Sequence, residues 1–215
     1  MNSLNALSRI FYEPSAETVA SRLLGQLLVR KTSRGWCGGV IVETEAYLRN
    51  DAAAHSFRGE TPRNRIMFGP PGYAYVYFIY GNHWCVNAVC RQRGIPEAVL
   101  IRAIEPTLGL DFMQGRRTVL NPHELTNGPG KLCAAMAIDR SLNGADLCDG
   151  KSPLFIARNP GRRTFLRRYG PVITTTRIGI KKAAALPLRF YLEQNPFVSC
   201  RIKKTVELVR PASLR

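Results

Sequence analysis

Two glutamates and an arginine lie inside segments that otherwise read as apolar β-strands. Glu43 and Glu45 occupy residues 42–47, and Arg102 interrupts the apolar run at residues 98–104. Side chains two residues apart on a strand share one face, so the two glutamates are predicted to lie side by side. Two carboxylates held close together cannot both ionise cheaply, and one of them could serve as a general base. The alternative is an exposed strand face that carries two solvated acids.

Arg102 and Asn87 are polar residues among apolar neighbours. An arginine in such a place almost always pairs with an acid or a phosphate, so Arg102 is expected either to serve the chemistry or to form a structural salt bridge. Asn87 lies within the apolar residues 84–89, and a buried amide needs hydrogen-bond partners. Because burying polar groups is costly unless they are paired or used, we interpret residues 42–102 as the part of the chain that carries the function.

Two strand-like runs at residues 73–80 and 83–90 are separated by a Gly-Asn pair, which predicts a β-hairpin with a two-residue turn. Tyr80 stands at the tip, where a large aromatic side chain has little core to fill. It is therefore a candidate wedge that inserts into another molecule. Tyr77 could likewise contact another molecule, or it could belong to the core. Most tyrosines in strands are core residues whose hydroxyl groups form hydrogen bonds.

The strong excess of positive charge indicates a polyanionic partner. The chain of 215 residues carries a formal net charge of +16 and has a pI of about 10.2. Lysines and arginines that bind phosphates release counterions, which makes nucleic acid the first candidate. The alternatives are charge for solubility and an anionic membrane surface, although no basic amphipathic helix with a clean apolar face is evident. Five arginines gather in residues 158–168, which we expect to form a loop.

The sequence gives no indication of a metal site or a membrane segment. The six cysteines form no C-x-x-C pair, and with the three histidines they lack the spacing of zinc ligands. Most cysteines lie in apolar runs, which suits reduced thiols in a cytosolic protein. No run approaches about 18 apolar residues, and the first nine residues lack a secretory pattern. Residues 128–131 read Gly-Pro-Gly-Lys before a predicted helix and form a candidate anion site, but they are not a P-loop.

The elements that must position these residues are mostly strands. The composition, with 45% hydrophobic residues, is that of a globular protein, and we expect a single domain over residues 1–215 with a basic tail at about 201–215. The predicted fold class is α+β, with a curved, mainly antiparallel β-sheet and surrounding short helices. Strands are expected at residues 26–31, 37–47, 73–80, 83–90, 98–104, 154–157, 172–178 and 188–192, and helices at residues 14–24, 61–68, 107–115 and 129–138.

A series of motifs resembles the alkyladenine (3-methyladenine) DNA glycosylase family. The motifs follow one another in order, at nearly the family's spacing, between residues 11 and 199. One such motif would be weak, but the ordered series is specific. The motifs are Val-Glu-Thr-Glu-Ala-Tyr (42–47), Ala-Ala-His (53–55), Thr-Pro-Arg-Asn-Arg (61–65), Tyr-Val-Tyr-Phe-Ile-Tyr-Gly (75–81), Leu-Ile-Arg-Ala-Ile-Glu-Pro (100–106), Gly-Pro-Gly-Lys-Leu (128–132), Arg-Ile-Gly (177–179) and Pro-Leu-Arg-Phe-Tyr (187–191).

The resemblance implies a monofunctional DNA glycosylase that starts base excision repair. Such an enzyme flips a damaged purine, alkylated or deaminated, out of duplex DNA and hydrolyses its N-glycosidic bond. By position, Glu45 would be the general base that activates a water. Arg102 and the backbone carbonyl of Ile178 would help to hold that water, and Glu43 would keep a structural role.

The same resemblance assigns the remaining site residues. Tyr47 and His55 would line one side of the flipped base and Tyr77 the other, while Asn87 would disfavour guanine by crowding its exocyclic amino group. Tyr80 would fill the gap left by the flipped nucleotide. The expected DNA-binding residues are Asn82 and His83 in the groove, together with Thr61, Arg63, Leu100, Lys131 and Arg177 as backbone or supporting contacts. Asn82 stands where a well-known member of the family carries a large apolar residue, so the lesion search or the distortion of the strand is expected to differ.

The resemblance implies no cofactor and no metal, because an electron-poor alkylated purine leaves readily. No lysine sits beside Glu45 or Arg102, which argues against a Schiff-base lyase step. The expected partner is double-stranded DNA containing damaged purines, bound by a monomer that does not associate with membranes. The long N-terminal extension of eukaryotic members is missing, so we expect a bacterial-type, cytoplasmic and nucleoid-associated protein; a eukaryotic one would be nuclear.

Two other functions remain open. A non-catalytic module that binds RNA or damaged DNA would bind in a salt-dependent way without base release and would be indifferent to Glu45→Gln. A protein that binds alkylated DNA as a signal would need Tyr80 but not Glu45. Glu45 and Arg102 lie inside apolar strands, and a surface that only binds nucleic acid does not require charged residues there. This feature favours the glycosylase over the two binding functions.

Overall fold

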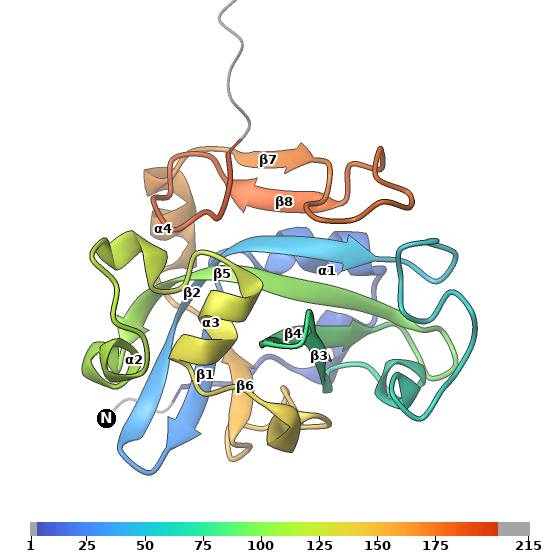
Figure 1. The fold of residues 1–215 in the computed structure, drawn as a ribbon, viewed down its shortest axis with the longest axis horizontal. Helices are drawn as coiled ribbons and strands as arrows, with labels where there is room; N and C mark the ends of the chain where they lie inside the picture. The colour runs from blue at the N-terminus through green and yellow to red at the C-terminus, as the bar shows by residue number, and fades with distance from the viewer. Residues whose placement is uncertain (1–3, 202–215) are drawn as a thin grey trace, which may run out of the picture.

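The computed structural model describes residues 4–201, which fold around one eight-stranded sheet (Figure 1). All paired strands are antiparallel, in the order β3-β4-β5-β2-β1-β6, and β8 pairs with both β2 and β7. The predicted α+β class is therefore confirmed. The strands are β1 Leu27–Thr32, β2 Gly35–Tyr47, β3 Ala74–Ile79, β4 His83–Cys90, β5 Glu97–Leu108, β6 Leu154–Ala157, β7 Val172–Thr175 and β8 Arg189–Leu192.

Short helices pack around this sheet. The described residues contain the α-helices α1 Ala16–Leu23, α2 Leu110–Arg116, α3 Pro129–Ala135 and α4 Arg162–Arg168, and the 3-10 helices Arg9–Tyr12, Arg65–Phe68, Pro122–Glu124 and Arg140–Leu142. The α1 helix begins where the Ser15 side chain accepts a hydrogen bond from the backbone of Thr18. It buries Val19 and Leu23 completely in the core that it shares with β2 and β5.

Strand β2 carries the two glutamates of the site and pairs with three other strands. One edge pairs with β1 and then with β8, while the other edge pairs with β5 along most of its length. The register with β5 shifts on both sides of Glu43, which leaves Val42 and Arg102 without direct cross-strand partners. Such bulges re-aim side chains. Here the guanidinium of Arg102 reaches the carboxylates of both Glu43 and Glu45.

The β3–β4 hairpin forms as predicted, but its predicted two-residue turn is wrong. Ile79 pairs with His83, so the loop has three residues. Tyr80 and Gly81 adopt left-handed backbone conformations, with φ of 55° and 72°. Tyr80 therefore leaves the strand and becomes the first residue of the loop, followed by Gly81 and Asn82.

Several predicted boundaries differ from the structure. β5 continues to Leu108, so the helix expected from residue 107 begins at Leu110, and α3 ends at Ala135 instead of residue 138. The strand expected over residues 172–178 ends at Thr175, which frees residues 176–180 to approach the site. The helix expected over residues 61–68 is a turn followed by a 3-10 helix from Arg65.

The arginine-rich residues 158–168 were expected to form a loop, and this prediction is wrong. They contain α4, whose Phe165 and Leu166 pack against the core. The Arg162 side chain also donates to the backbone carbonyl of Leu24 over 2.8 Å. The contacts of Phe165 and Leu166 with the core stabilise this helix, and these contacts are not visible in the local sequence. Most of the predicted basic tail, beyond residue 201, lies outside the described residues.

Candidate active site

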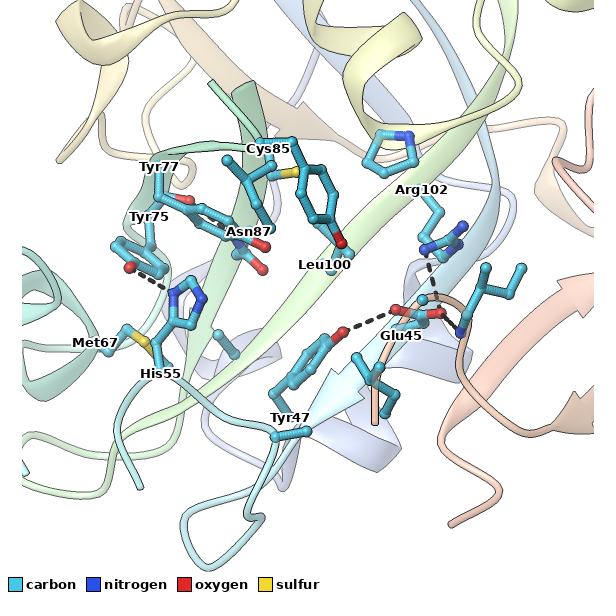
Figure 2. Close-up of a pocket in the computed structure, with 18 residues that line it drawn as sticks. Glu45, Tyr47, His55, Met67, Tyr75, Tyr77, Cys85, Asn87, Leu100 and Arg102 are labelled. Atoms are coloured by element: carbon cyan, nitrogen blue, oxygen red, sulfur yellow. Dashed lines mark hydrogen bonds and ion pairs between the residues drawn. The ribbon is translucent and has the colours of Figure 1, made fainter. Parts of the chain in front are cut away.

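A cavity of about 270 Å³ opens where β2, β3, β4 and β5 meet residues 178–180 (Figure 2). Its walls are largely aromatic and apolar, and its two charged side chains lie at one end. Figure 2 shows Glu45 and Arg102 at that end and His55, Tyr75 and Tyr77 at the other. The lining residues are Glu45, Tyr47, Ala53, His55, Met67, Tyr75, Tyr77, Ile79, Tyr80, Cys85, Asn87, Ala98, Leu100, Arg102, Pro129, Ile178, Gly179 and Ile180.

The carboxylate of Glu45 is fully buried and is held from three directions. Its Oε1 accepts a hydrogen bond from the backbone N–H of Ile178 over 2.8 Å and lies 3.2 Å from Nη1 of Arg102. Its Oε2 accepts from the hydroxyl of Tyr47 over 3.0 Å. These contacts fix the orientation of the carboxylate at the end of the cavity. Ile178 thus contacts Glu45 through its N–H, whereas the sequence pointed to a role for its carbonyl.

Glu43 lies behind this end of the cavity and holds the arginine. Its Oε1 accepts from Nε of both Arg102 and Arg189 and from the hydroxyl of Ser199, each over 2.8 Å. Its Oε2 accepts from the backbone N–H of Ser199 over 2.7 Å. Burial alone would raise the pKa of Glu43, but the positive charges of Arg102 and Arg189 hold the pKa below its usual value. Glu43 is therefore an ionised anchor and does not line the cavity.

Arg102 bridges the two carboxylates. Burial opposes its charge, but Glu45 and Glu43 raise the pKa of its guanidinium above the ordinary value. The expectation that Arg102 pairs with an acid is confirmed. Arg189, which the sequence reasoning missed, carried the same signal, since it too is a lone arginine in an apolar run, residues 188–192.

The aromatic side chains form two walls, and His55 belongs to the wall opposite the one expected. Its ring packs edge-on against Tyr77 with centroids 4.4 Å apart, and its Nδ1 lies 2.9 Å from the hydroxyl of Tyr75. A flat base has no room between rings in contact, so His55 is grouped with Tyr77 and not with Tyr47. The reason is the Asn64 side chain, which donates to the backbone carbonyl of His55 and pins the turn.

The titratable groups of these walls are neutral at physiological pH. Removal from water and the nearby charge of Arg63 lower the pKa of His55, so its imidazole is uncharged. Burial raises the pKa of Tyr75 to about 12 and moves the pKa of Tyr47 and of Tyr77 upward as well. The three hydroxyl groups therefore keep their protons and can donate hydrogen bonds.

Asn87 lines the cavity from β4 and is buried as predicted. Its side-chain N–H donates to the backbone carbonyl of Tyr75 over 3.0 Å, across the β3–β4 pair. This bond fixes the orientation of the amide by holding its N–H group against strand β3. The expectation that this buried amide has a hydrogen-bond partner is confirmed.

The mouth of the cavity carries the exposed residues that were predicted to contact DNA. The Tyr80 side chain is 76% exposed, and Asn82 and His83 beside it are also exposed. His83 packs against Gly130, where an added Cβ would lie 2.8 Å from its ring, so only glycine permits this approach. The Thr61 side chain caps the turn before Arg65 by accepting from the N–H of Asn64.

Two predicted DNA-binding cations flank the cavity at half-exposed or exposed positions. Arg63 donates to the backbone carbonyl of Phe78 over 2.8 Å and lies over the ring of Tyr77. Nζ of Lys131 donates to the side chain of Asn127 over 2.9 Å and lies 3.7 Å from a carboxylate oxygen of Glu124. Both ammonium and guanidinium groups remain accessible to a phosphate.

Arg177 and Leu100 do not lie where a DNA contact would have to be. The Arg177 side chain is fully buried, paired with Asp51, bonded to the carbonyl of Ala46 and stacked on the ring of Tyr47 at 4.6 Å. The side chain of Asp51 also accepts a hydrogen bond from the N–H of Ala53 over 2.9 Å and caps the turn that follows it. Leu100 is 3% exposed and forms cavity wall. The family resemblance suggested a backbone or supporting contact for Arg177. Its burial against Asp51 could not be predicted, because that pairing depends on the fold.

Within residues 4–201 no cluster of three or more His, Cys, Asp or Glu side chains could hold a metal ion. No described helix is long and apolar enough to cross a membrane.

A match to a protein-family model and the similarity to known proteins indicate the same family. Residues 10–196 match the methylpurine-DNA glycosylase family. The chain is 53% identical over 195 residues to a protein of Methanoculleus marisnigri, which covers 91% of this chain and 99% of that protein. It is 47% identical to a protein of Carboxydothermus hydrogenoformans, covering 90% and 98%. Both relatives carry the provisional name 3-methyladenine DNA glycosylase. The chain belongs to the methylpurine-DNA glycosylase family.

Proposed function

We propose that this protein is a 3-methyladenine DNA glycosylase that removes alkylated and deaminated purines from duplex DNA by hydrolysis. The observation that carries the proposal is the fully buried Glu45 carboxylate, fixed by Ile178, Arg102 and Tyr47 at the end of an aromatic-walled cavity. A base inside a duplex must be extruded before its sugar bond can be reached, and a cavity of this kind can receive it.

The damaged base lies between Tyr47 on one side and the His55–Tyr77 pair on the other. Stacking on aromatic rings recovers about 1–3 kcal/mol per base, which offsets part of the cost of extrusion. Asn87 holds its amide against the edge of the base and crowds the exocyclic amino group of guanine. Tyr80 takes the place of the flipped nucleotide in the DNA stack, and Asn82 and His83 lie in the groove beside it.

Hydrolysis uses a water held next to Glu45. The Glu45 side chain takes a proton from this water as the oxygen attacks C1′ of the sugar, and the base leaves with the electrons of the N-glycosidic bond. Arg102 and the backbone at Ile178 keep the carboxylate and the water in place. The products are a free base and an abasic site, and no covalent enzyme intermediate forms.

The reaction ends with base release and includes no lyase step. Among the described residues that line the cavity none is a lysine, so none of these side chains offers an amine that could attack the sugar. Thr61, Arg63 and Lys131 contact the DNA backbone around the mouth. We also propose that residues 1–215 act as one domain and that the protein works as a monomer.

The test is single-turnover excision from duplexes that carry 3-methyladenine, 7-methylguanine, hypoxanthine or ethenoadenine. The wild-type protein releases the damaged base, and Glu45→Gln lowers the rate by about 10²–10⁴-fold, the usual contribution of a general base. Glu17→Gln, which neutralises an exposed carboxylate on α1, is the matched control and keeps the wild-type rate. A full rate in Glu45→Gln, or no release from any of the four duplexes, contradicts the proposal.

A further inference from the structure

A second hollow, of about 430 Å³, lies at the end of the β3–β4 hairpin that is away from Tyr80. It is lined by Arg9, Glu13, Pro71, Arg91, Gln92 and Arg93, none of which lines the first cavity. Pro71 precedes β3 and Arg91 follows β4. Because a strand rises roughly 3.3 Å per residue, the eight residues of β4 place this hollow about 25 Å from the hairpin tip.

Three guanidinium groups and one carboxylate face this hollow. Arg9 is already engaged, since it donates to a carboxylate oxygen of Asp146 over 2.6 Å and to the carbonyl of Pro71 over 2.7 Å. Arg91 and Arg93 differ from it, because neither side chain has an ion pair or a hydrogen bond to any residue in the range 4–201. Glu13 is exposed and offsets only part of this charge.

The backbone of Arg91 is held in an unusual conformation, although its side chain has no partner among the described residues. Its backbone adopts a left-handed conformation with φ of 67°, which is uncommon for a residue other than glycine, and its N–H donates to the carbonyl of Tyr12 over 2.9 Å. Its side-chain Nε is buried and has no acceptor among the described residues. A buried donor without an acceptor is costly, and the guanidinium to which it belongs lines the hollow.

We propose that this hollow binds a phosphate group, separately from the cavity that contains Glu45. The planar fork of arginine matches the oxygens of a phosphate, and two unpaired arginines at one hollow can share the oxygens of one tetrahedral anion. The phosphate comes either from the backbone of DNA beyond the damaged nucleotide or from a free phosphate. The inference rests on Arg91 and Arg93 alone and does not depend on excision activity.

The chain offers variants that change the hollow without disturbing the fold. Arg91→Asn removes the guanidinium and suits the left-handed backbone, in which asparagine is enriched. Arg93→Gln removes a charge from an exposed position, and Glu13→Gln removes the opposing carboxylate. The control is Arg34→Gln, which deletes one exposed positive charge in the turn between β1 and β2.

The first arm measures the rise in Tm when chloride is replaced by inorganic phosphate at equal ionic strength. Phosphate stabilises proteins in general, so the readout is the difference between variants. A ligand that binds only the folded state raises Tm with its concentration. We expect the additional rise to be lost in Arg91→Asn and Arg93→Gln, kept in Arg34→Gln and enlarged in Glu13→Gln.

The second arm measures how salt weakens binding to short and long undamaged duplexes. If a backbone phosphate occupies the hollow, Arg91→Asn and Arg93→Gln each lower the slope of log K against log salt by about one on the long duplex, whereas Arg34→Gln leaves it unchanged. If a free phosphate is the ligand, the slopes stay the same while the Tm effect is lost. Absence of both effects in Arg91→Asn and Arg93→Gln overturns the proposal.

Discussion

Arg102 donates its Nε–H to Oε1 of Glu43 over 2.8 Å, and Glu43 lies outside the cavity that Arg102 lines. The same guanidinium extends Nη1 to within 3.2 Å of Glu45. The two glutamates, which lie two residues apart on β2, therefore share one cation but differ in their access to the cavity. This division of roles supports Glu45 as the general base and Glu43 as the anchor of the arginine.

Glu43→Gln is expected to lower the free energy of unfolding by about 3–5 kcal/mol. The substitution leaves the buried guanidiniums of Arg102 and Arg189 beside a neutral amide, and removing one member of a buried charge pair has this cost. Denaturant unfolding measures it, with Glu17→Gln as the exposed control that changes stability by less than about 0.5 kcal/mol. A loss as small as that of the control would show that the anchor is not needed.

The same carboxylate predicts how stability depends on pH. Because the pKa of Glu43 is lower in the folded protein than in the unfolded chain, its contribution is complete above the ordinary carboxyl pKa and is lost as the pH falls through the lower, folded value. Denaturant unfolding at a series of acidic pH values should therefore show a steeper fall for wild type than for Glu43→Gln. Equal slopes for the two proteins would contradict the lowered pKa.

Tyr80→Ala is expected to reduce excision from duplex DNA much more than excision from single strands. A wedge is needed only where a stacked, paired nucleotide must be extruded. The Tyr80 side chain is 76% exposed, so unfolding measurements should show little change in stability. Leu120→Ala, at a fully exposed apolar side chain, is the control. An equal loss on both substrates would show that Tyr80 acts in some other way.

His55 predicts a loss of activity in acid. Its pKa is lowered by removal from water and by Arg63, so the ring stays neutral down to a pH below the ordinary histidine value and becomes charged only beyond it. A charged imidazole repels a cationic alkylated base. The pH profile of kcat/KM for 3-methyladenine should fall on the acid side in wild type, and His55→Gln should remove that step. A step that persists in the variant belongs to another group.

Arg177→Gln separates a positioning role from a DNA contact. The substitution leaves Asp51 buried without its partner and removes the support behind Tyr47, so we expect a loss of about 3–5 kcal/mol in stability and a lower kcat. The salt dependence of DNA binding should not change, because the side chain is fully buried. Arg63→Gln, at an exposed position, should lower that slope by about one. A lower slope in Arg177→Gln would restore it as a phosphate contact.

The sequence by itself determined the residues that are costly to bury and the local elements that carry them. Polar side chains in apolar runs marked Glu45, Arg102 and Asn87, and the structure buries all three with partners. The limits of β4 and β6 were predicted to the residue, because period and turn signals are local. Tyr80 was placed at the hairpin tip for the same reason, although its left-handed backbone was not foreseen.

Only the tertiary structure decided which of these groups meet. The bulges on either side of Glu43 bring Arg102 between two carboxylates, and a register shift cannot be read from either strand alone. The position of His55 beside Tyr77, the burial of Arg177 against Asp51 and the helical form of residues 162–168 all depend on contacts between segments far apart in the chain. The local pattern specifies which polar side chains need hydrogen-bond or charge partners. The packing of distant strands and loops determines which residues those partners are.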